Sequence, residues 1–377
     1  MLDRHPTGPS SSLNRIVRAQ AGLARLLLGI ALASSLGCSG GPRGQTGANA
    51  ASQAMVVVAT ERAPGGGGRL VSVAQNGDRL HVLTQGQSRK VYIDRSPEFT
   101  PDGKMLFFAS NRSRSRVDTT SLWTVGVSGG EPVRITQGEY SDRDPRVSPD
   151  GRWLYFCSDR EGRFQLYRAQ ITADSSLQSI EQIPTGEGEV LSPSVSPDGQ
   201  ELVYMHIDAE GDSALWKVDS DGKGQPEQLT QGPLDMAPSW GRSGAIAYST
   251  KGLGRPDADL YLLVDGESQL VVNSPTTDEL GARWSRDGRY LFAIGMYRSA
   301  VDGKPLLGSL VFVDMQEETR VLRVLQDSSA VESRIGLAIF PDFFDPSAMR
   351  KNPEYHEALR KVMLQEALRN EAPLQAK

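Results

Sequence analysis

Apolar residues in this chain gather in short continuous runs, separated by polar segments that favour turns. Residues 105–109 read MLFFA and residues 153–157 read WLYFC, with no charged position inside either run. A short continuous run of this kind is typical of a strand that is buried on both faces, whereas a half-buried strand alternates apolar and polar positions. The pattern therefore predicts strands that are packed between neighbouring sheets.

A turn sequence precedes these runs at a nearly constant spacing. It reads PDG at residues 101–103, 149–151 and 197–199, RSG at 242–244 and RDG at 286–288, and the glycines are 48, 48, 45 and 44 residues apart. Proline fixes φ, aspartate hydrogen-bonds to its own backbone, and glycine accepts positive φ. Repeats of this length that contain several short strands are typical of a β-propeller with one blade per repeat.

Each repeat contains four predicted strands, which is the number in a propeller blade. A short strand precedes the turn, as in residues 96–99 (SPEF) and 144–147 (DPRV), and the apolar run follows the turn. The third strand carries leucine and a large residue, as in Leu122-Trp123, and the fourth ends in TQG or TG, as at residues 136–138.

The two ends of the chain supply a sixth repeat. Residues 55–62 align with residues 105–112, but no first strand precedes them, and residues 333–335 (SRI) resemble residues 282–284 (ARW). We therefore predict an all-β, six-bladed propeller over residues 54–341, whose first blade is closed by a C-terminal strand at residues 335–340. Closure of this kind removes an exposed sheet edge.

The repeat resembles the WD-like repeat, or PD-repeat, of the TolB β-propeller family. The strongest copies are residues 96–112 and 144–160, in which Ser/Asp-Pro, the PDG turn, the apolar run and a final arginine follow in order, and the resemblance covers about residues 55–340. It implies the propeller fold and leaves the function open. Only a short linker precedes the first repeat, so we expect no counterpart of the N-terminal α/β domain of TolB.

The N-terminus has the pattern of an export signal. Arginines precede an apolar core at residues 26–33, which is too short to span a bilayer, and residues 35–38 (SLGC) resemble a bacterial lipobox. We expect residues 1–37 to be a signal peptide, Cys38 to be lipidated, and residues 38–53 to form a flexible tether. The chain would then be a lipoprotein of the bacterial cell envelope, at the outer membrane and facing the periplasm or the surface. The alternative is an ordinary secretory signal that is cleaved beside Cys38.

The C-terminal tail, residues 342–377, differs from the repeats because its apolar residues recur at helical spacing. Pro353 suits the first position of a helix, and Tyr355, Leu359, Val362 and Met363 follow on one face. We predict a C-terminal α-helix over about residues 354–370, which either docks on the propeller or binds a partner.

Composition and motifs point away from several functions. The chain has 41 basic and 46 acidic residues, a net charge of −5, which disfavours nucleic acid as a partner. Residues 126–130 (GVSGG) match the G-x-S-x-G string of serine hydrolases, but they fall between a third and a fourth strand, where a hairpin turn is expected. Only His81 and His206 lie in the repeats. We therefore predict no catalytic residue, no metal site and no cofactor.

The candidate binding residues lie in the loops opposite the Pro-Asp-Gly turns, because loops carry function more often than blades do. Tyr140, Arg143, Arg160 and Asp235 are the predicted binding residues. We hypothesise a non-catalytic, envelope-anchored propeller that binds or scaffolds protein, peptide or peptidoglycan-associated partners. The alternative is an exported hydrolase or lyase that acts on carbohydrate or peptide. A close carboxylate pair or carboxylate–histidine pair in the central funnel, which these loops surround, would favour this alternative.

Overall fold

A computed structural model describes residues 30–33, 55–60, 69–74, 80–84, 92–113, 119–251, 257–272, 277–285, 287–298 and 305–324. These residues all belong to one compact unit, Leu26–Phe340. All the regular secondary structure of the described residues is β-strand, arranged in six four-stranded antiparallel sheets. The structure therefore confirms an all-β propeller.

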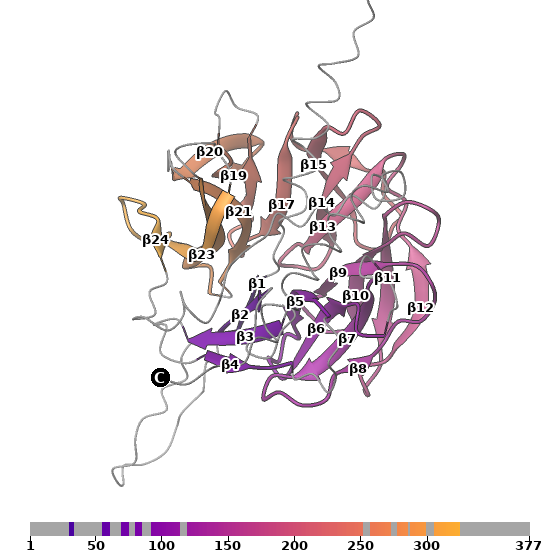
Figure 1. The fold of residues 1–377 in the computed structure, drawn as a ribbon. Helices are drawn as coiled ribbons and strands as arrows, with labels where there is room; N and C mark the ends of the chain where they lie inside the picture. The colour runs from indigo at the N-terminus through magenta and orange to yellow at the C-terminus, as the bar shows by residue number, and fades with distance from the viewer. Residues whose placement is uncertain are drawn as a thin grey trace, which may run out of the picture. The chain divides into compact units, whose positions relative to one another are not determined.

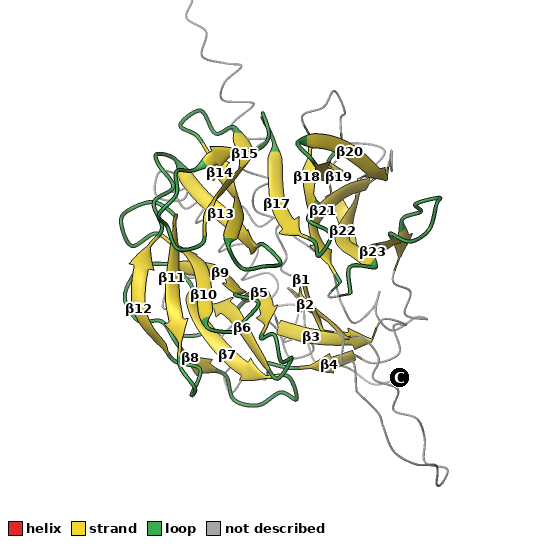
Figure 2. Cartoon of the chain, turned by 180° about the vertical axis from the view of Figure 1, so that it is seen from behind, coloured by secondary structure: helices red, strands yellow, loops and turns green. Residues whose placement is uncertain are grey.

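Each sheet pairs its strands in chain order, from a first strand near the axis to a fourth strand at the outside (Figures 1 and 2). The first strands are β1 (Ile30–Ala33), β5 (Asp94–Phe99), β9 (Asp142–Val147), β13 (Glu189–Val195), β17 (Asp235–Trp240) and β21 (Thr277–Trp284). The second strands are β2 (Met55–Thr60), β6 (Met105–Ser110), β10 (Trp153–Ser158), β14 (Glu201–Ile207), β18 (Ile246–Thr250) and β22 (Tyr290–Arg298). The third strands are β3 (Arg69–Ala74), β7 (Ser121–Gly126), β11 (Gln165–Ile171), β15 (Ser213–Asp219), β19 (Asp259–Val264) and β23 (Pro305–Asp314). The fourth strands are β4 (Leu80–Val82), β8 (Val133–Arg134), β12 (Leu177–Gln182), β16 (Glu227–Gln228), β20 (Glu267–Val272) and β24 (Arg323–Val324).

The first strands contact one another in a closed circuit. β5 contacts β9, β9 contacts β13, β13 contacts β17 and β17 contacts β21, while β1 contacts both β5 and β21. The ends of five strands that are remote in sequence thus meet around one axis.

The apolar runs are buried between neighbouring sheets, as predicted. Phe107 and Phe108 in β6 are both fully buried, and they belong to different core clusters. Phe107 packs with Leu154 and Phe156 of the next blade, whereas Phe108 packs with Leu70 of the preceding sheet. Successive side chains of a strand point to opposite faces, so a run that is apolar at every position fills the core on both sides.

The Pro-Asp-Gly sequences form the predicted tight turns between first and second strands. In the turn at residues 148–151, the N–H of Gly151 donates to the carbonyl oxygen of Ser148 at 2.9 Å, and φ of Gly151 is 75°. The Asp150 carboxylate accepts hydrogen bonds from the Ser148 hydroxyl and from the N–H of Arg152. Positive φ explains why glycine stands at this position in every copy.

Each first strand of the five blades contains a β-bulge at the same place. Its register with the second strand shifts there, and the residue at the shift has positive φ. These residues are Ser96 (48°), Asp144 (52°), Ser192 (51°), Ala237 (52°) and Gly281 (69°). A bulge bends a strand and re-aims the side chains that follow it. The residues after the bulge are those that meet at the end of the axis.

The structure corrects the prediction of six blades in which a C-terminal strand closes the first. Of the six sheets, five are blades of the predicted kind, and the sixth, β1–β4, is completed in another way. Five blades run from β5 to β24, and the first strand of the remaining sheet is β1 rather than a C-terminal strand. Ile30 pairs with Val58 and Ala33 with Met55, so an apolar segment near the N-terminus satisfies this edge of β2. The same four residues belong to the apolar core of the predicted export signal. Residues 335–340, Cys38, the tether and the predicted helix lie outside the described residues.

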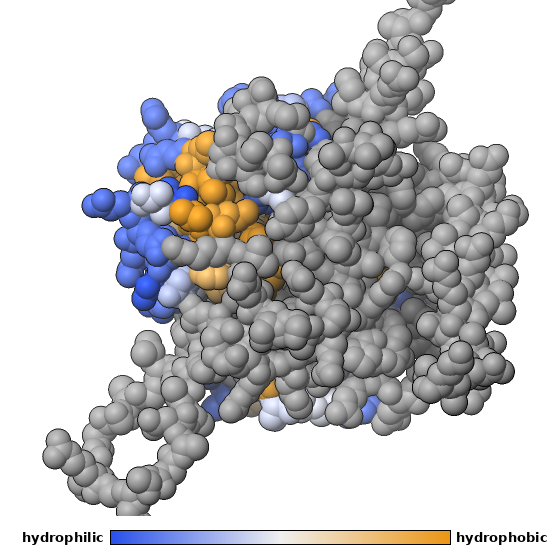
Figure 3. Space-filling view, turned by 60° about the vertical axis from the view of Figure 1, so that its left-hand side comes forward, coloured by the Kyte–Doolittle hydropathy of each residue, from blue (hydrophilic) through white to orange (hydrophobic). Residues whose placement is uncertain are grey.

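The described surface carries both apolar and charged side chains, and Figure 3 shows an apolar area bordered by hydrophilic residues. The exposed large apolar side chains are Val133, Ile180, Leu270 and Val321. They lie in β8, β12, β20 and the segment that precedes β24, and these four strands belong to four different sheets.

Candidate functional site

Buried aspartate–arginine pairs occupy the end of the propeller where the first strands begin. Asp94 pairs with Arg112, whose Nε lies 3.0 Å from Asp94 Oδ1, and the Arg112 guanidinium lies over the Tyr92 ring. The next blade repeats the arrangement with Asp142, Arg160 and Tyr140. A unit that recurs at equivalent positions of two blades is a structural feature of the repeat.

Two of the predicted binding residues, Tyr140 and Arg160, belong to the second of these units. Arg160 Nη2 lies 3.2 Å from Asp142 Oδ1, and its guanidinium carbon lies 4.6 Å from the Tyr140 ring centroid and 4.5 Å from that of Tyr167. Burial raises the pKa of Asp142, against hydrogen bonds from Ser158 and the charge of Arg160. Most of the Arg160 guanidinium surface is therefore covered within the chain.

The other two predicted residues lie in separate contacts. Arg143 Nε donates to Asp144 Oδ2 at 3.2 Å, and its guanidinium lies over the Phe164 ring. Asp235 is buried, and its Oδ2 accepts a hydrogen bond from the N–H of Gly232 at 3.1 Å. The structure thus brings Tyr140 and Arg160 together and places Arg143 and Asp235 elsewhere on the same end of the propeller.

A further buried acid, Glu279, lies near the start of β21. Burial raises its pKa to about 8, with a contribution from the negative charges of Asp259, Asp278 and Asp257, while a hydrogen bond from Thr277 acts in the other direction. Among the described residues, no group of three or more His, Cys, Asp or Glu side chains is arranged to hold a metal ion.

A cavity of about 320 Å³ lies at the opposite end, where the first strands finish and the Pro-Asp-Gly turns begin. We call it the axial cavity. Its lining comes from the last residues of β5, β9, β13, β17 and β21 and from the turns that follow them. This volume is within the range of sites that hold small molecules or a short peptide segment.

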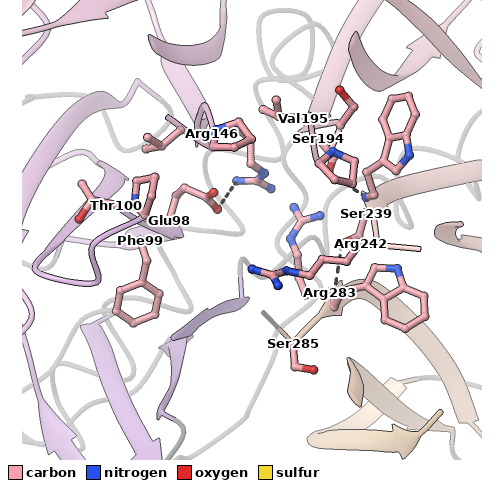
Figure 4. A pocket seen from close by; sticks show the side chains of 17 residues that line it. Glu98, Phe99, Thr100, Arg146, Ser194, Val195, Ser239, Arg242, Arg283 and Ser285 are labelled. Atoms are coloured by element: carbon pink, nitrogen blue, oxygen red, sulfur yellow. Dashed lines mark hydrogen bonds and ion pairs between the residues drawn. The ribbon is translucent and has the colours of Figure 1, made fainter. Parts of the chain in front are cut away.

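Equivalent positions of the five first strands supply the polar lining of the axial cavity. The next-to-last residues of these strands are Glu98, Arg146, Ser194, Ser239 and Arg283, and Arg242 joins them from a turn. Figure 4 shows their side chains directed into one space. The repeat supplies the same backbone position each time, but three different residue types, Glu, Arg and Ser, occupy it.

The serines of the lining fix the neighbouring blades to one another. Ser194 Oγ accepts a hydrogen bond from the N–H of Trp240 at 2.9 Å, and Ser239 Oγ accepts one from the N–H of Trp284 at 3.3 Å. Both serines are at least nine-tenths buried. A hydroxyl that accepts a hydrogen bond still has its own proton to donate. Each serine can therefore also serve a ligand in the cavity.

Tryptophan rings form the apolar part of the wall. Trp240 Nε1 donates to the carbonyl oxygen of Gly244 at 3.1 Å, which fixes its ring. The Trp284 ring lies against Gly241, where an added Cβ would be 2.8 Å from Trp284 Cε2. Glycine at position 241 is thus required by the close approach of this ring.

Glu98 and Arg146 face each other in the axial cavity. Arg146 Nη1 lies 3.8 Å from Glu98 Oε2 and donates a 2.6 Å hydrogen bond to the carbonyl oxygen of Pro145. Burial raises the pKa of Glu98 to about 7, although the charge of Arg146 and a hydrogen bond from the Val147 backbone act to lower it. Nearby Asp144 behaves differently: burial raises its pKa, but the charges of Arg143 and Arg146 and a hydrogen bond from Ser96 lower it overall.

The sequence contains a signal for this site that the loop-based prediction did not use. When the five first strands are aligned on their turns, the next-to-last position reads E, R, S, S and R. A position that is variable and polar within an otherwise regular repeat indicates a place that the fold leaves to function. The prediction placed function on the opposite end because it gave weight to loops alone.

Among the described residues, the lining of the axial cavity offers one carboxylate, Glu98, and no histidine. Residues 126–130 form the turn between β7 and β8, where the N–H of Gly129 donates to the carbonyl oxygen of Gly126 at 2.9 Å, so the G-x-S-x-G string is a hairpin turn as predicted.

Within the described part of the chain, we find no helix of the length and hydropathy needed to cross a bilayer.

The blades, the closed circuit of first strands and the cavity at its end define the chain as a β-propeller protein. The family model of the TolB β-propeller domain (PD40) matches residues 83–287, which is more than half of the chain. The chain therefore belongs to the TolB β-propeller family, as its repeats indicated.

Solved structures of similar fold come from proteins of different kinds. TolB from Acinetobacter baumannii has a TM-score of 0.55 and 17% identity over 72% of this chain and 65% of its own. A structure from Agrobacterium tumefaciens assigned as TolB has a TM-score of 0.53 and 19% identity over 66% of this chain and 84% of its own.

A puromycin-hydrolyzing peptidase from Mycobacterium tuberculosis has a TM-score of 0.51 and 16% identity over 75% of this chain and 44% of its own. The match thus spans less than half of that peptidase. No curated protein sequence matches this chain. Identities this low show a shared fold, and a propeller fold serves many functions.

Proposed function

We propose that this chain is a non-catalytic binding propeller of the bacterial cell envelope, which engages a protein or peptide partner through the axial cavity. The proposal includes the export signal over residues 1–37 and the lipid anchor at Cys38, which the sequence pattern supports. Removal of this signal would also remove β1 (Ile30–Ala33), so in the mature chain the edge of β2 would need another partner. It moves the binding surface from the loops around Tyr140 and Arg160 to the end of the axis.

The composition of the axial cavity is the observation that carries this proposal. Five blades contribute side chains to one space, and these side chains include arginines, serine hydroxyls and tryptophan rings. Arginine and tryptophan are the residue types that dominate binding energy in protein interfaces. Acid–base chemistry on a glycan or peptide calls for paired carboxylates or a carboxylate–histidine pair, and the described residues of the lining supply a single carboxylate, Glu98. The arrangement therefore supports binding over hydrolysis at the axial cavity.

The test is a pull-down from envelope extract with three forms of the purified chain. Arg242→Glu reverses a charge at the axial cavity, and Arg163→Glu makes the same change at an exposed position near the opposite end. We expect the parent and Arg163→Glu to retain the same partner and Arg242→Glu to lose it. A partner that all three forms retain, or retention that fails only with Arg163→Glu, would place the binding surface elsewhere.

An activity assay completes the test. If the purified parent chain cleaves a peptide or oligosaccharide and Glu98→Gln abolishes the cleavage, the chain is an enzyme and the proposal of a binding propeller is wrong.

A further inference from the structure

Positive charge is in excess in the axial cavity, although the chain as a whole has a net charge of −5. The guanidinium groups of Arg146, Arg242 and Arg283 enter the cavity, and Glu98 is the one carboxylate among the described residues of its lining (Figure 4). Arg146 has Glu98 at 3.8 Å, whereas no ion pair joins Arg242 or Arg283 to a carboxylate of the described residues. Two cationic side chains therefore lack an acidic counterpart in the part of the chain that the structure describes.

The remaining contacts hold Arg283 in place without neutralising it. Its Nη1 donates to the carbonyl oxygen of Pro238 at 3.0 Å, which leaves its other N–H groups for a ligand. Guanidinium groups present parallel N–H donors that match a carboxylate in a bidentate manner. The Ser194 and Ser239 hydroxyls add donors beside them, because each already accepts a backbone hydrogen bond. The site is thus rich in donors and suits an anion.

We propose that the axial cavity binds a carboxylate of an acidic peptide segment between Arg242 and Arg283, while Glu98 competes with that carboxylate for Arg146. This inference rests on the proposed function, because a protein partner presents its anions as aspartate, glutamate or C-terminal carboxylates. The tryptophan rings at the wall would cover the aliphatic or aromatic residues next to the acidic one.

Glu98 makes this binding depend on pH. The charged groups that line the same cavity are Arg146 on β9, Arg242 in its turn and Arg283 on β21. Above about pH 7 the Glu98 carboxylate is ionised, repels an incoming carboxylate and occupies Arg146. Below that pH it is protonated, so Arg146 becomes available to the ligand. Binding of a carboxylate should therefore strengthen as the pH falls from 8 to 6.

The experiment measures fluorescence anisotropy of two peptides, GEGEG and GQGQG, each labelled at the N-terminus and amidated at the C-terminus so that only the glutamates carry carboxylates, with the full chain at low ionic strength. We expect GEGEG to bind at least about tenfold more tightly than GQGQG, which corresponds to one charge-assisted interaction. Arg242→Gln and Arg283→Gln should each weaken GEGEG binding about tenfold. Arg163→Gln, the matched control, should leave it unchanged. Glu98→Gln should strengthen it at pH 8 and remove its pH dependence between pH 6 and 8.

Several results would overturn this inference. One is equal binding of the two peptides. Another is unchanged binding of GEGEG to the Arg242→Gln/Arg283→Gln double variant, provided that this variant melts like the parent. A third is displacement of labelled GEGEG by inorganic phosphate or oligogalacturonate at a lower concentration than unlabelled GEGEG requires. The last result would assign the site to phosphate or to acidic glycan.

The pull-down separates failure of this inference from failure of the proposed function. If the parent and the Arg242→Gln/Arg283→Gln variant capture the same partner, the binding function stands and the carboxylate inference falls. If GEGEG binds the parent and not this variant, while no form of the chain captures a partner, the inference about the ligand stands and the proposed function falls.

Discussion

The two ends of the propeller axis carry the same kinds of charged side chain but use them differently. Where the first strands begin, Arg112 and Arg160 are paired with the buried carboxylates of Asp94 and Asp142. Where the first strands finish, Arg242 and Arg283 have no such pairing among the described residues. Charges that recur from blade to blade hold the fold together, whereas charges that differ from blade to blade are available to a ligand.

The largest expected effect is the loss of a paired arginine at the first of these ends. Arg160→Ala leaves Asp142, which is fully buried, without its cation, and breaking a buried pair in this way costs about 3 kcal/mol of the free energy of unfolding. Urea unfolding at pH 7 measures the loss. Arg163→Ala, at an exposed position three residues away, should change the free energy of unfolding by less than about 0.5 kcal/mol. Equal effects of the two variants would show that the pair does not stabilise the fold.

A medium effect is expected from the acid at the other end. Burial raises the pKa of Glu98 from 4.5 to about 7. Between pH 4.5 and 7, Glu98 therefore holds a proton in the folded state, whereas in the unfolded state it has lost that proton. This contribution to stability is fully present below pH 4.5 and is lost as the pH rises through 7. A shift of this size corresponds to about 3 kcal/mol, and because the Glu98 side chain is 23% exposed, the parent should lose on the order of 2 kcal/mol of stability between pH 4.5 and 8 relative to Glu98→Gln.

Chemical denaturation of the parent and Glu98→Gln at several pH values measures this difference, since other titrating groups contribute to both curves and cancel. Parallel stability curves across this range would mean that Glu98 titrates as an exposed carboxyl, and the two ends would then differ less than the geometry indicates.

The smallest effect on stability is expected for an arginine of the axial cavity. Arg242 is exposed, and no hydrogen bond or ion pair ties it to the described residues. Arg242→Ala should therefore change the free energy of unfolding by less than about 0.5 kcal/mol. Urea unfolding beside Arg160→Ala compares the same substitution at the two ends. A loss as large as that of Arg160→Ala would make Arg242 a structural residue and remove the contrast.

Local sequence was sufficient for most of the architecture. The apolar runs at residues 105–109 and 153–157 lie in β6 and β10, and the turns at residues 101–103 and 149–151 connect first to second strands. These features depend on residues close in the chain, because a tight turn and a doubly buried strand are each specified by a few consecutive side chains. The family followed from the same repeats.

The sequence was insufficient where strand pairing is remote. Ile30–Ala33 lies within the predicted export signal, which stays a prediction, and its pairing with β2 in the structure was not foreseen. An apolar run of this length satisfies a signal core and a sheet edge equally well. Which edge it joins depends on a segment more than twenty residues further along the chain, so no local pattern decides it.

The candidate site shows the same division. The sequence by itself determined the repeats, the turns, the buried strands and the family, since these are repeated local patterns. Only the tertiary structure decided which end of the axis carries unpaired charge. Glu98, Arg146 and Arg283 lie in three separate repeats, and they meet because a bulge in each first strand re-aims its last side chains and the circuit of first strands closes around one axis. Such a meeting is a property of the assembled sheets and of no single segment.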